Sequence, residues 1–242
     1  MRQPIAADAT PPAVDTSGSW ALRVLAIAAI GIAAIAAMML AVPPIRQPHA
    51  YHGFADAHPW LGIPHAQNVL SNLPFVFVGI AGLRWLQRWD AAVDQELQPA
   101  YATLFLGLTA TAFGSMYYHW APSSEALFWD RLPIAVSFMG LFAAVLGERI
   151  GPKIGREALA PLIVFGAASV IFWRFNDDLR PYAIAQFFPL IAILLLLALF
   201  PARFTGGGAL LVAIGCYVGA KALEEFDKPI HAALGEMLQR VA

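Results

Sequence analysis

About seven apolar runs, separated by short polar or proline-containing stretches, set the pattern of this chain. Each run approaches the ~20 residues that an α-helix needs to cross the ~30 Å hydrocarbon core of a bilayer. The runs cover residues 20–42, 68–86, 100–118, 126–147, 158–175, 181–200 and 208–224. The alternating pattern of a transmembrane barrel is absent. The sequence therefore predicts an all-α fold, a polytopic transmembrane helix bundle of about seven spans.

Residues 1–19 precede the first run and form a polar, proline-rich leader, which we expect to be disordered. The run that follows, 20–42, is longer than the ~7–15-residue apolar region of a signal peptide. We therefore expect it to be a retained span. Residues 20–242 are expected to form a single transmembrane domain.

Composition agrees with a membrane protein and argues against a nucleic-acid-binding one. Hydrophobic residues make up 59% of the chain and charged residues 13%, whereas about a quarter of the residues of a soluble domain are charged. The net charge is −1, and no basic stripe with interleaved aromatic residues is present. Cys216 is the one cysteine, so no intramolecular disulfide and no cysteine-based metal cluster can form.

Lysine and arginine are unevenly divided between the two faces that seven spans would define. The face with the N-terminus carries Arg2, Arg23, Arg84, Arg88, Arg149, Lys153, Arg156 and Arg203, and the other carries Arg46, Arg174, Arg180, Lys228 and Arg240. An excess of these residues in short loops marks the cytoplasmic side. We therefore expect a bacterial inner-membrane protein with a cytoplasmic N-terminus. The end of the third run would face the periplasm.

Ser115 and His119 lie near the end of the third run, and Asp130 lies just inside the fourth. Four residues apart, Ser115 and His119 share one helix face, and the short break at 120–124 lets Asp130 return to the same depth. Ionisable groups at membrane depth are costly, so the cluster is a functional-site hypothesis. A metal bound by histidine could activate water, and a carboxylate could accept its proton. Alternatively, His119 and Asp130 pair with each other or with Arg131 and hold two helices together.

A second polar group precedes and enters the second run. Asn68, Ser71 and Asn72 fall on one helix face, where their oxygens suit either a hard cation or helix capping and hydrogen bonds between helices. Four of the six histidines lie in the preceding loop: His49, His52, His58 and His65. Their spacing fits no standard metal-ligand pattern, so we interpret most of them as solvated interfacial residues.

Three blocks of residues, taken in order, resemble the alkaline ceramidases and the wider superfamily of seven-helix membrane hydrolases, in particular its bacterial branch. The blocks contain Phe54, Asp56, Asn68, Ser71, Asn72, Pro74 and Phe75, then Gly114, Ser115 and His119, then Trp129, Asp130, Arg131 and Pro133. The likeness covers roughly residues 54–233. It implies six family-core spans in this chain, preceded by 20–42 as an extra span.

The resemblance also implies roles for individual residues. His119 would be a zinc ligand, Ser115 would stabilise the transition state, and Asp130 would be the general acid/base. The implied reaction is zinc-dependent hydrolysis of the amide bond of ceramide-like or other N-acyl lipids, which reach the site through the bilayer. Family members also hold calcium in the acidic segment before the second run. Asp56 matches that segment, and His65 stands where a glutamate is expected.

The family's last helix supplies two further zinc histidines in a His-x-x-x-His pattern, which is missing here because His231 has no partner four residues away. A catalytic zinc normally takes three protein ligands plus water. Three interpretations stay open: the sequence is part of a longer chain, loop histidines complete the site, or the protein is a metal-free relative. The rival to a hydrolase is a catalytically inactive, receptor-like or scaffolding bundle in which the same polar groups hold the helices together.

Overall fold

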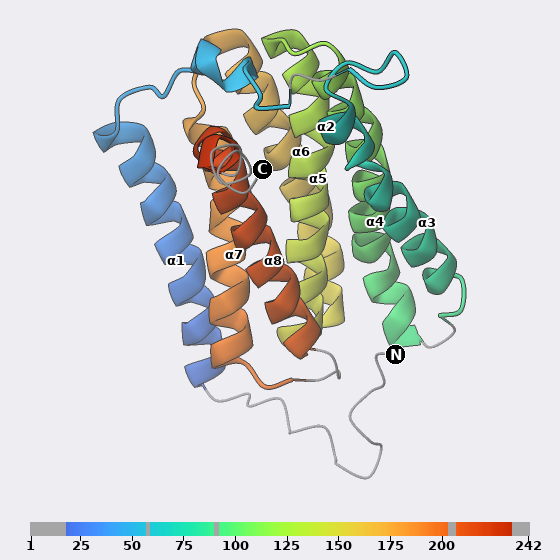
Figure 1. Cartoon of the computed structure of the whole chain (residues 1–242). Coiled ribbons are helices and arrows are strands. Elements are labelled where there is room, and N and C mark those ends of the chain that lie inside the picture. Colours follow the sequence, from blue (N-terminus) through green and yellow to red (C-terminus); the bar gives the residue numbers. More distant parts are fainter. Residues whose placement is uncertain (1–17, 57–58, 90–91, 203–206, 234–242) are drawn as a thin grey trace.

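The computed structural model describes residues 18–56, 59–89, 92–202 and 207–233. In these residues the chain forms a bundle of helices (Figure 1). The helices are α1 (Gly18–Ala41), the short 3₁₀ helix η1 (His49–His52), α2 (Ala66–Leu70), α3 (Leu73–Leu86), α4 (Ala92–Trp120), α5 (Ser124–Arg149), α6 (Pro152–Asn176), α7 (Arg180–Leu199) and α8 (Gly207–Glu225). The predicted all-α fold is confirmed. The leader predicted over 1–19 lies almost entirely outside the described residues.

The long helices run side by side and alternate in direction (Figure 1). One end of the bundle, uppermost in Figure 1 and called the upper end below, contains the loop before α2, the ends of α4 and α6, and the starts of α5 and α7. The residues predicted to form a site, Ser115, His119 and Asp130, all lie toward this end.

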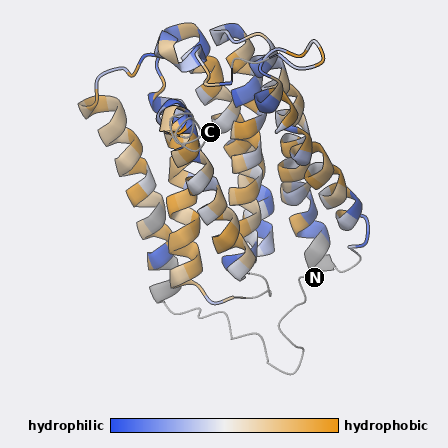
Figure 2. Cartoon of the chain, in the orientation of Figure 1, coloured by the Kyte–Doolittle hydropathy of each residue, from blue (hydrophilic) through white to orange (hydrophobic). Residues whose placement is uncertain are grey.

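Six helical segments are long and apolar enough to cross a membrane. They are Leu22–Ala41, Ala66–Leu86, Ser124–Arg149, Pro152–Asn176, Arg180–Leu199 and Gly207–Glu225. Apolar residues cover most of their length, and hydrophilic residues gather near the helix ends (Figure 2). These segments indicate a membrane protein. The third predicted run lies within α4, which is 29 residues long but is not among the six, because polar residues such as Thr109 and Thr111 lower its mean hydropathy.

α5 is the central helix, and it contacts α4, α6 and α7. Glycines allow α4 and α5 to approach closely. A Cβ atom on Gly107 would lie 2.2 Å from Ser137 Oγ, and one on Gly114 would lie 2.1 Å from the carbonyl oxygen of Trp129. Small residues at such crossings let helix backbones pack tightly in membranes. This approach sets the spacing between the end of α4 and the start of α5.

The helix of the second predicted run is broken into α2 and α3. Near the break, the Ser71 hydroxyl donates to the carbonyl oxygen of Asn68 at 2.9 Å, and the Asn72 amide donates to the same oxygen at 2.8 Å. These two side chains therefore bond to the local backbone, although the Asn72 side chain does not cap α3. The pattern agrees with the tendency of Ser and Asn to compete with regular helix bonds.

A buried ion pair joins the α6–α7 turn to the end of α1. Arg180 Nη2 lies 2.7 Å from Asp178 Oδ2, and Arg180 Nη1 donates to the carbonyl oxygens of Met39 and Val42 at 2.8 and 2.6 Å. The Asp178 carboxylate also accepts from the Ile45 amide at 3.4 Å. The Arg180–Asp178 ion pair thus connects the end of α1, the residues that follow it and the α6–α7 turn.

Replacing Asp178 with asparagine should lower the thermal unfolding midpoint, and most strongly at neutral pH. Hydrogen bonds from Arg180 hold the pKa of Asp178 below its ordinary value. The ionised carboxylate therefore stabilises the fold above the unfolded-state pKa of about 4, and this contribution is lost as pH falls through the lower folded-state pKa. Melting curves in detergent should show a full difference between wild type and Asp178→Asn at about pH 7 that shrinks below about pH 4. A difference independent of pH would contradict the prediction.

Candidate functional site

Ser115, His119 and Asp130 lie toward the upper end of the bundle, on α4 and α5. Ser115 and His119 are one turn apart on α4, and Asp130 lies in the second turn of α5. The start of α5 is fixed by Ser123, whose hydroxyl oxygen accepts from the Ala126 amide at 3.1 Å, an ordinary N-cap. The two helices approach closely at Gly114, directly before Ser115.

Asp130 is buried, with 9% of its surface exposed. The Ser115 side chain lies near its carboxylate, while its Oδ1 atom is buried and has no hydrogen-bond partner among the described residues. Within the described ranges, Asp130 forms no ion pair with His119 or Arg131. The alternative that these side chains pair with one another is therefore not what the structure shows. A buried oxygen without a partner is costly and marks a place for a polar ligand.

The His119 side chain packs against aromatic rings and forms no ion pair with the described residues. Its ring is 4.7 Å from the Phe54 ring and 5.2 Å from the Tyr118 ring, measured between centroids. Its Nδ1 atom is buried and has no hydrogen-bond partner. His119 thus offers one imidazole nitrogen that has no partner among the described residues.

Residues 47–56, which we call the strap, cross the upper end of the bundle and are bound by side chains from α4, α5 and the end of α8. The Tyr51 hydroxyl donates to Glu224 Oε1 at 2.8 Å, and the Ala55 amide donates to Asp227 Oδ2 at 2.8 Å. The two ring nitrogens of His52 contact the Tyr118 hydroxyl at 3.0 Å and Ser124 Oγ at 3.1 Å. The strap therefore covers the Ser115, His119 and Asp130 cluster.

His52 is held neutral in this position. Burial lowers its pKa, and the nearby cationic charges of His49 and Arg131 lower it further. A neutral imidazole can donate from one nitrogen and accept at the other, which matches its two hydroxyl partners. His52 therefore bonds to α4 and α5, whereas the sequence pattern suggested that most of the loop histidines are solvated.

Asp56 caps a helix. Its Oδ2 atom accepts from the Asn68 amide at 3.1 Å, and its backbone carbonyl contacts the His65 ring. A carboxylate at a helix N-terminus is favourable for both hydrogen bonding and the helix dipole. This position accounts for Asp56 without calcium, and the calcium prediction stays a prediction.

A zinc site needs several donor side chains close together, and the described residues near His119 can be checked for them. Among the described residues, no three His, Cys, Asp or Glu side chains lie together in a way that could hold a metal ion. His119, with its free Nδ1, could be one ligand, and a catalytic zinc normally needs three. His58 lies outside the described residues. The described donors therefore do not fit a zinc site by themselves, and zinc stays a prediction.

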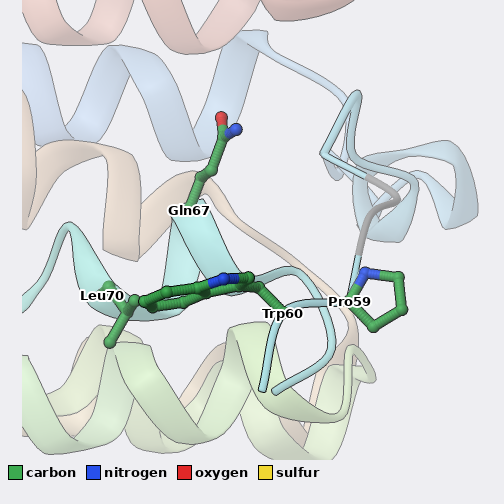
Figure 3. Close-up of a pocket in the computed structure, with 5 residues that line it drawn as sticks. Pro59, Trp60, Gln67 and Leu70 are labelled. Atoms are coloured by element: carbon green, nitrogen blue, oxygen red, sulfur yellow. The ribbon is translucent and has the colours of Figure 1, made fainter. Parts of the chain in front are cut away.

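A separate apolar pocket of about 350 Å³ lies beside α2 (Figure 3). It is lined by Pro59, Trp60, Ala66, Gln67 and Leu70, and the Trp60 ring extends along α2 toward Leu70. None of these side chains is ionisable. The pocket can take an apolar group, and its lining offers no acid or base.

The sequence pattern did not identify Tyr51, His52 or Glu224 as neighbours of the cluster. Their contacts depend on the path of the strap across the bundle, which has no helical period to reveal it. The one available signal was the concentration of histidines in the loop before the second run. The sequence predicted Arg131 as a possible partner of His119 or Asp130, whereas its main contacts are with aromatic rings.

Comparisons of the chain with protein-family models, with curated proteins and with solved structures found no match.

Proposed function

We propose that the chain is an integral-membrane hydrolase that cleaves the amide bond of ceramide-like or other N-acyl lipids, with Asp130 as general acid/base. The observation that carries the proposal is the buried Asp130 carboxyl, which has Ser115 near it and is left without a partner at Oδ1. An ionisable group at this depth is expensive and marks function by default. The buried Nδ1 of His119, at the same end of the bundle, also has no partner among the described residues.

In the proposed reaction, Asp130 accepts a proton from water as the water oxygen attacks the amide carbonyl carbon. Ser115, whose side chain lies near the carboxylate, would position it for this step, and its hydroxyl would support the oxyanion. The carbon–nitrogen bond then breaks, and Asp130 returns the proton to the leaving amine. The products are a fatty acid and an amine. General acid–base catalysis of this kind contributes about 10²–10⁴-fold to a rate.

Zinc and calcium are also proposed as bound ions, but the hydrolysis steps described above do not require either of them. His119 would be the zinc ligand within the described residues, and further ligands would have to come from outside them. Asp56 would be the calcium ligand. Zinc, when bound, would supply Lewis-acid chemistry at the carbonyl.

The proposed location is a bacterial inner membrane, with the N-terminus in the cytoplasm and the upper end facing the periplasm. The support is the distribution of lysine and arginine between the two faces. Lipid substrates would then enter from the bilayer at the level of the outer leaflet.

His119→Ala in the full chain tests the proposed zinc ligand. We expect wild type in detergent to release the fluorophore from a labelled N-acyl lipid. His119→Ala would lose a ligand of the zinc that would polarise the carbonyl, and we expect it to hydrolyse the lipid at least about 10²-fold more slowly. Zinc content is measured on the same samples, and we expect it to fall in His119→Ala. His49→Ala, which removes an exposed histidine of the strap, should retain full activity. A wild-type protein that is inert toward such lipids and free of zinc would refute the proposal.

The rival function, a catalytically inactive receptor-like or scaffolding bundle, is favoured by one specific observation. The strap is fixed by several side-chain hydrogen bonds, among them Tyr51 to Glu224 and Ala55 to Asp227, so polar groups near the cluster clearly serve structure. On that view His119→Ala would lower the unfolding midpoint and change no activity or metal content.

A further inference from the structure

Arg131, directly after Asp130 on α5, is a buried cation surrounded by aromatic rings. Only 6% of its surface is exposed. Its guanidinium carbon lies 4.3 Å from the centroid of the Trp173 ring, 5.0 Å from that of Tyr182 and 5.5 Å from that of Tyr51. Cation–π contacts of this type stabilise a desolvated guanidinium only in part.

The charge of Arg131 has no anion in contact with it. Its Nη2 atom donates to the neutral amide oxygen of Gln47 at 2.7 Å, and its Nη1 atom is buried without a hydrogen-bond partner. In the part of the chain that the structure describes, no carboxylate lies within ion-pair distance of its guanidinium. A buried charge that is not paired is strongly unfavourable.

Arg180, at the same end of the bundle, shows how this chain satisfies an arginine with a structural role. Its Nη2 and Nε atoms donate to both oxygens of Asp178 at 2.7 to 3.0 Å. Arg180 thus carries a bidentate carboxylate partner within the chain, and Arg131 does not. The difference indicates that the partner of Arg131 is not part of the described protein.

We propose that Arg131 binds the phosphate group of an anionic membrane lipid. A guanidinium fork matches the geometry of phosphate and is preferred for it. Arg131 lies in the second turn of a membrane helix, and its Trp and Tyr neighbours are the residues typical of the interface where lipid head groups lie. The phosphate would replace the Gln47 amide as acceptor, because Gln47 and Tyr51 of the strap are what cover this side of Arg131.

The proposal deepens the proposed function and rests on it in one respect: if the chain is a lipid hydrolase, the lipid bound here is its substrate. A phosphate held by Arg131 would place the rest of that lipid beside Asp130, one residue away on α5. The substrate class would then be N-acyl lipids with an anionic phosphate head group.

Lipid binding measured without turnover tests the inference. The full chain in detergent is titrated with dioleoyl phosphatidylglycerol, with dioleoylglycerol, which lacks the phosphate, and with inorganic phosphate, and bound lipid is counted by native mass spectrometry. We expect wild type to prefer phosphatidylglycerol over dioleoylglycerol, and Arg131→Gln to bind phosphatidylglycerol at least about tenfold more weakly. Arg174→Gln, which removes an exposed cation at the same end, should change this affinity by less than about twofold.

Each outcome decides the matter. Competition by inorganic phosphate would support a site for the phosphate group itself, and its absence together with Arg131-dependent lipid binding would identify the lipid as the source. Equal binding by wild type and Arg131→Gln, or an equal loss in Arg131→Gln and Arg174→Gln, would overturn the proposal.

If Arg131→Gln does not fold, Arg131→Lys provides a second test, because it keeps the charge without the guanidinium fork. We expect Arg131→Lys to bind phosphatidylglycerol several-fold more weakly than wild type, and unchanged binding would also overturn the proposal. Because no turnover is needed, failure here leaves the hydrolase proposal to be tested separately by lipid hydrolysis.

Discussion

Asp130→Asn should reduce hydrolysis of an N-acyl lipid by about 10²–10⁴-fold. Asparagine has nearly the same shape as aspartate, and its amide oxygen can still accept a hydrogen bond. The substitution therefore removes the proton acceptor and leaves the packing of α4 against α5 largely unchanged. The rate is measured with a fluorescent N-acyl lipid on the full chain in detergent, and the unfolding midpoint is measured on the same sample.

Glu125→Gln is the matched control for this prediction. Glu125 is an exposed carboxylate in the first turn of the same helix, so its loss changes the local charge by the same amount without touching the cluster. We expect its hydrolysis rate to stay within about twofold of wild type, as for an exposed charge. An Asp130→Asn protein with the wild-type rate and a lowered unfolding midpoint would support the scaffolding role instead.

Gly114→Ala should destabilise the bundle more than any other single-methyl change at the upper end. The added Cβ atom would lie 2.1 Å from the carbonyl oxygen of Trp129 and 2.8 Å from its carbonyl carbon, and backbone atoms cannot move aside as a flexible side chain can. α4 and α5 must therefore separate. Overpacking of this kind costs about 1–3 kcal/mol or more. Thermal or denaturant unfolding in detergent measures the loss.

Gly215→Ala provides the control for that substitution. Gly215 lies within α8, and a Cβ atom there would meet nothing within 4 Å. Alanine has a higher helix propensity than glycine by about 1 kcal/mol, so this change should be neutral or stabilising. Gly114→Ala should also separate Ser115 from Asp130, so we expect lipid hydrolysis to fall with it. Equal stability of the two variants would show that α4 and α5 are not closely packed at Gly114.

The helices were predictable because their signal is local. Long apolar runs predict membrane helices whatever the rest of the chain does, and the runs at 126–147 and 181–200 agree with α5 and α7 within a few residues. Errors occurred where polar residues continue a helix beyond its apolar part. α4 begins at Ala92, eight residues before the predicted run, because a helix can extend past the hydrocarbon layer without an apolar face.

The site was predictable only in part. The four-residue spacing of Ser115 and His119 and the short break before Asp130 follow helix geometry, so the sequence could predict that all three lie toward one end of the bundle. The contacts of Tyr51 and His52 join segments far apart in the chain through an irregular loop. No period or motif encodes the path of such a loop, so these neighbours could be found only from the structure.

The strap also constrains the order in which the protein can be completed during synthesis. Tyr51 and its partner Glu224 are 173 residues apart, and Ala55 and Asp227 are 172 residues apart. The strap leaves the ribosome long before these two partners exist, so its bonds to Glu224 and Asp227 can form only after α8 has been made. The contacts of His52 with Tyr118 and Ser124 depend only on α4 and α5 and can form earlier. The last described helix therefore completes the attachment of the strap.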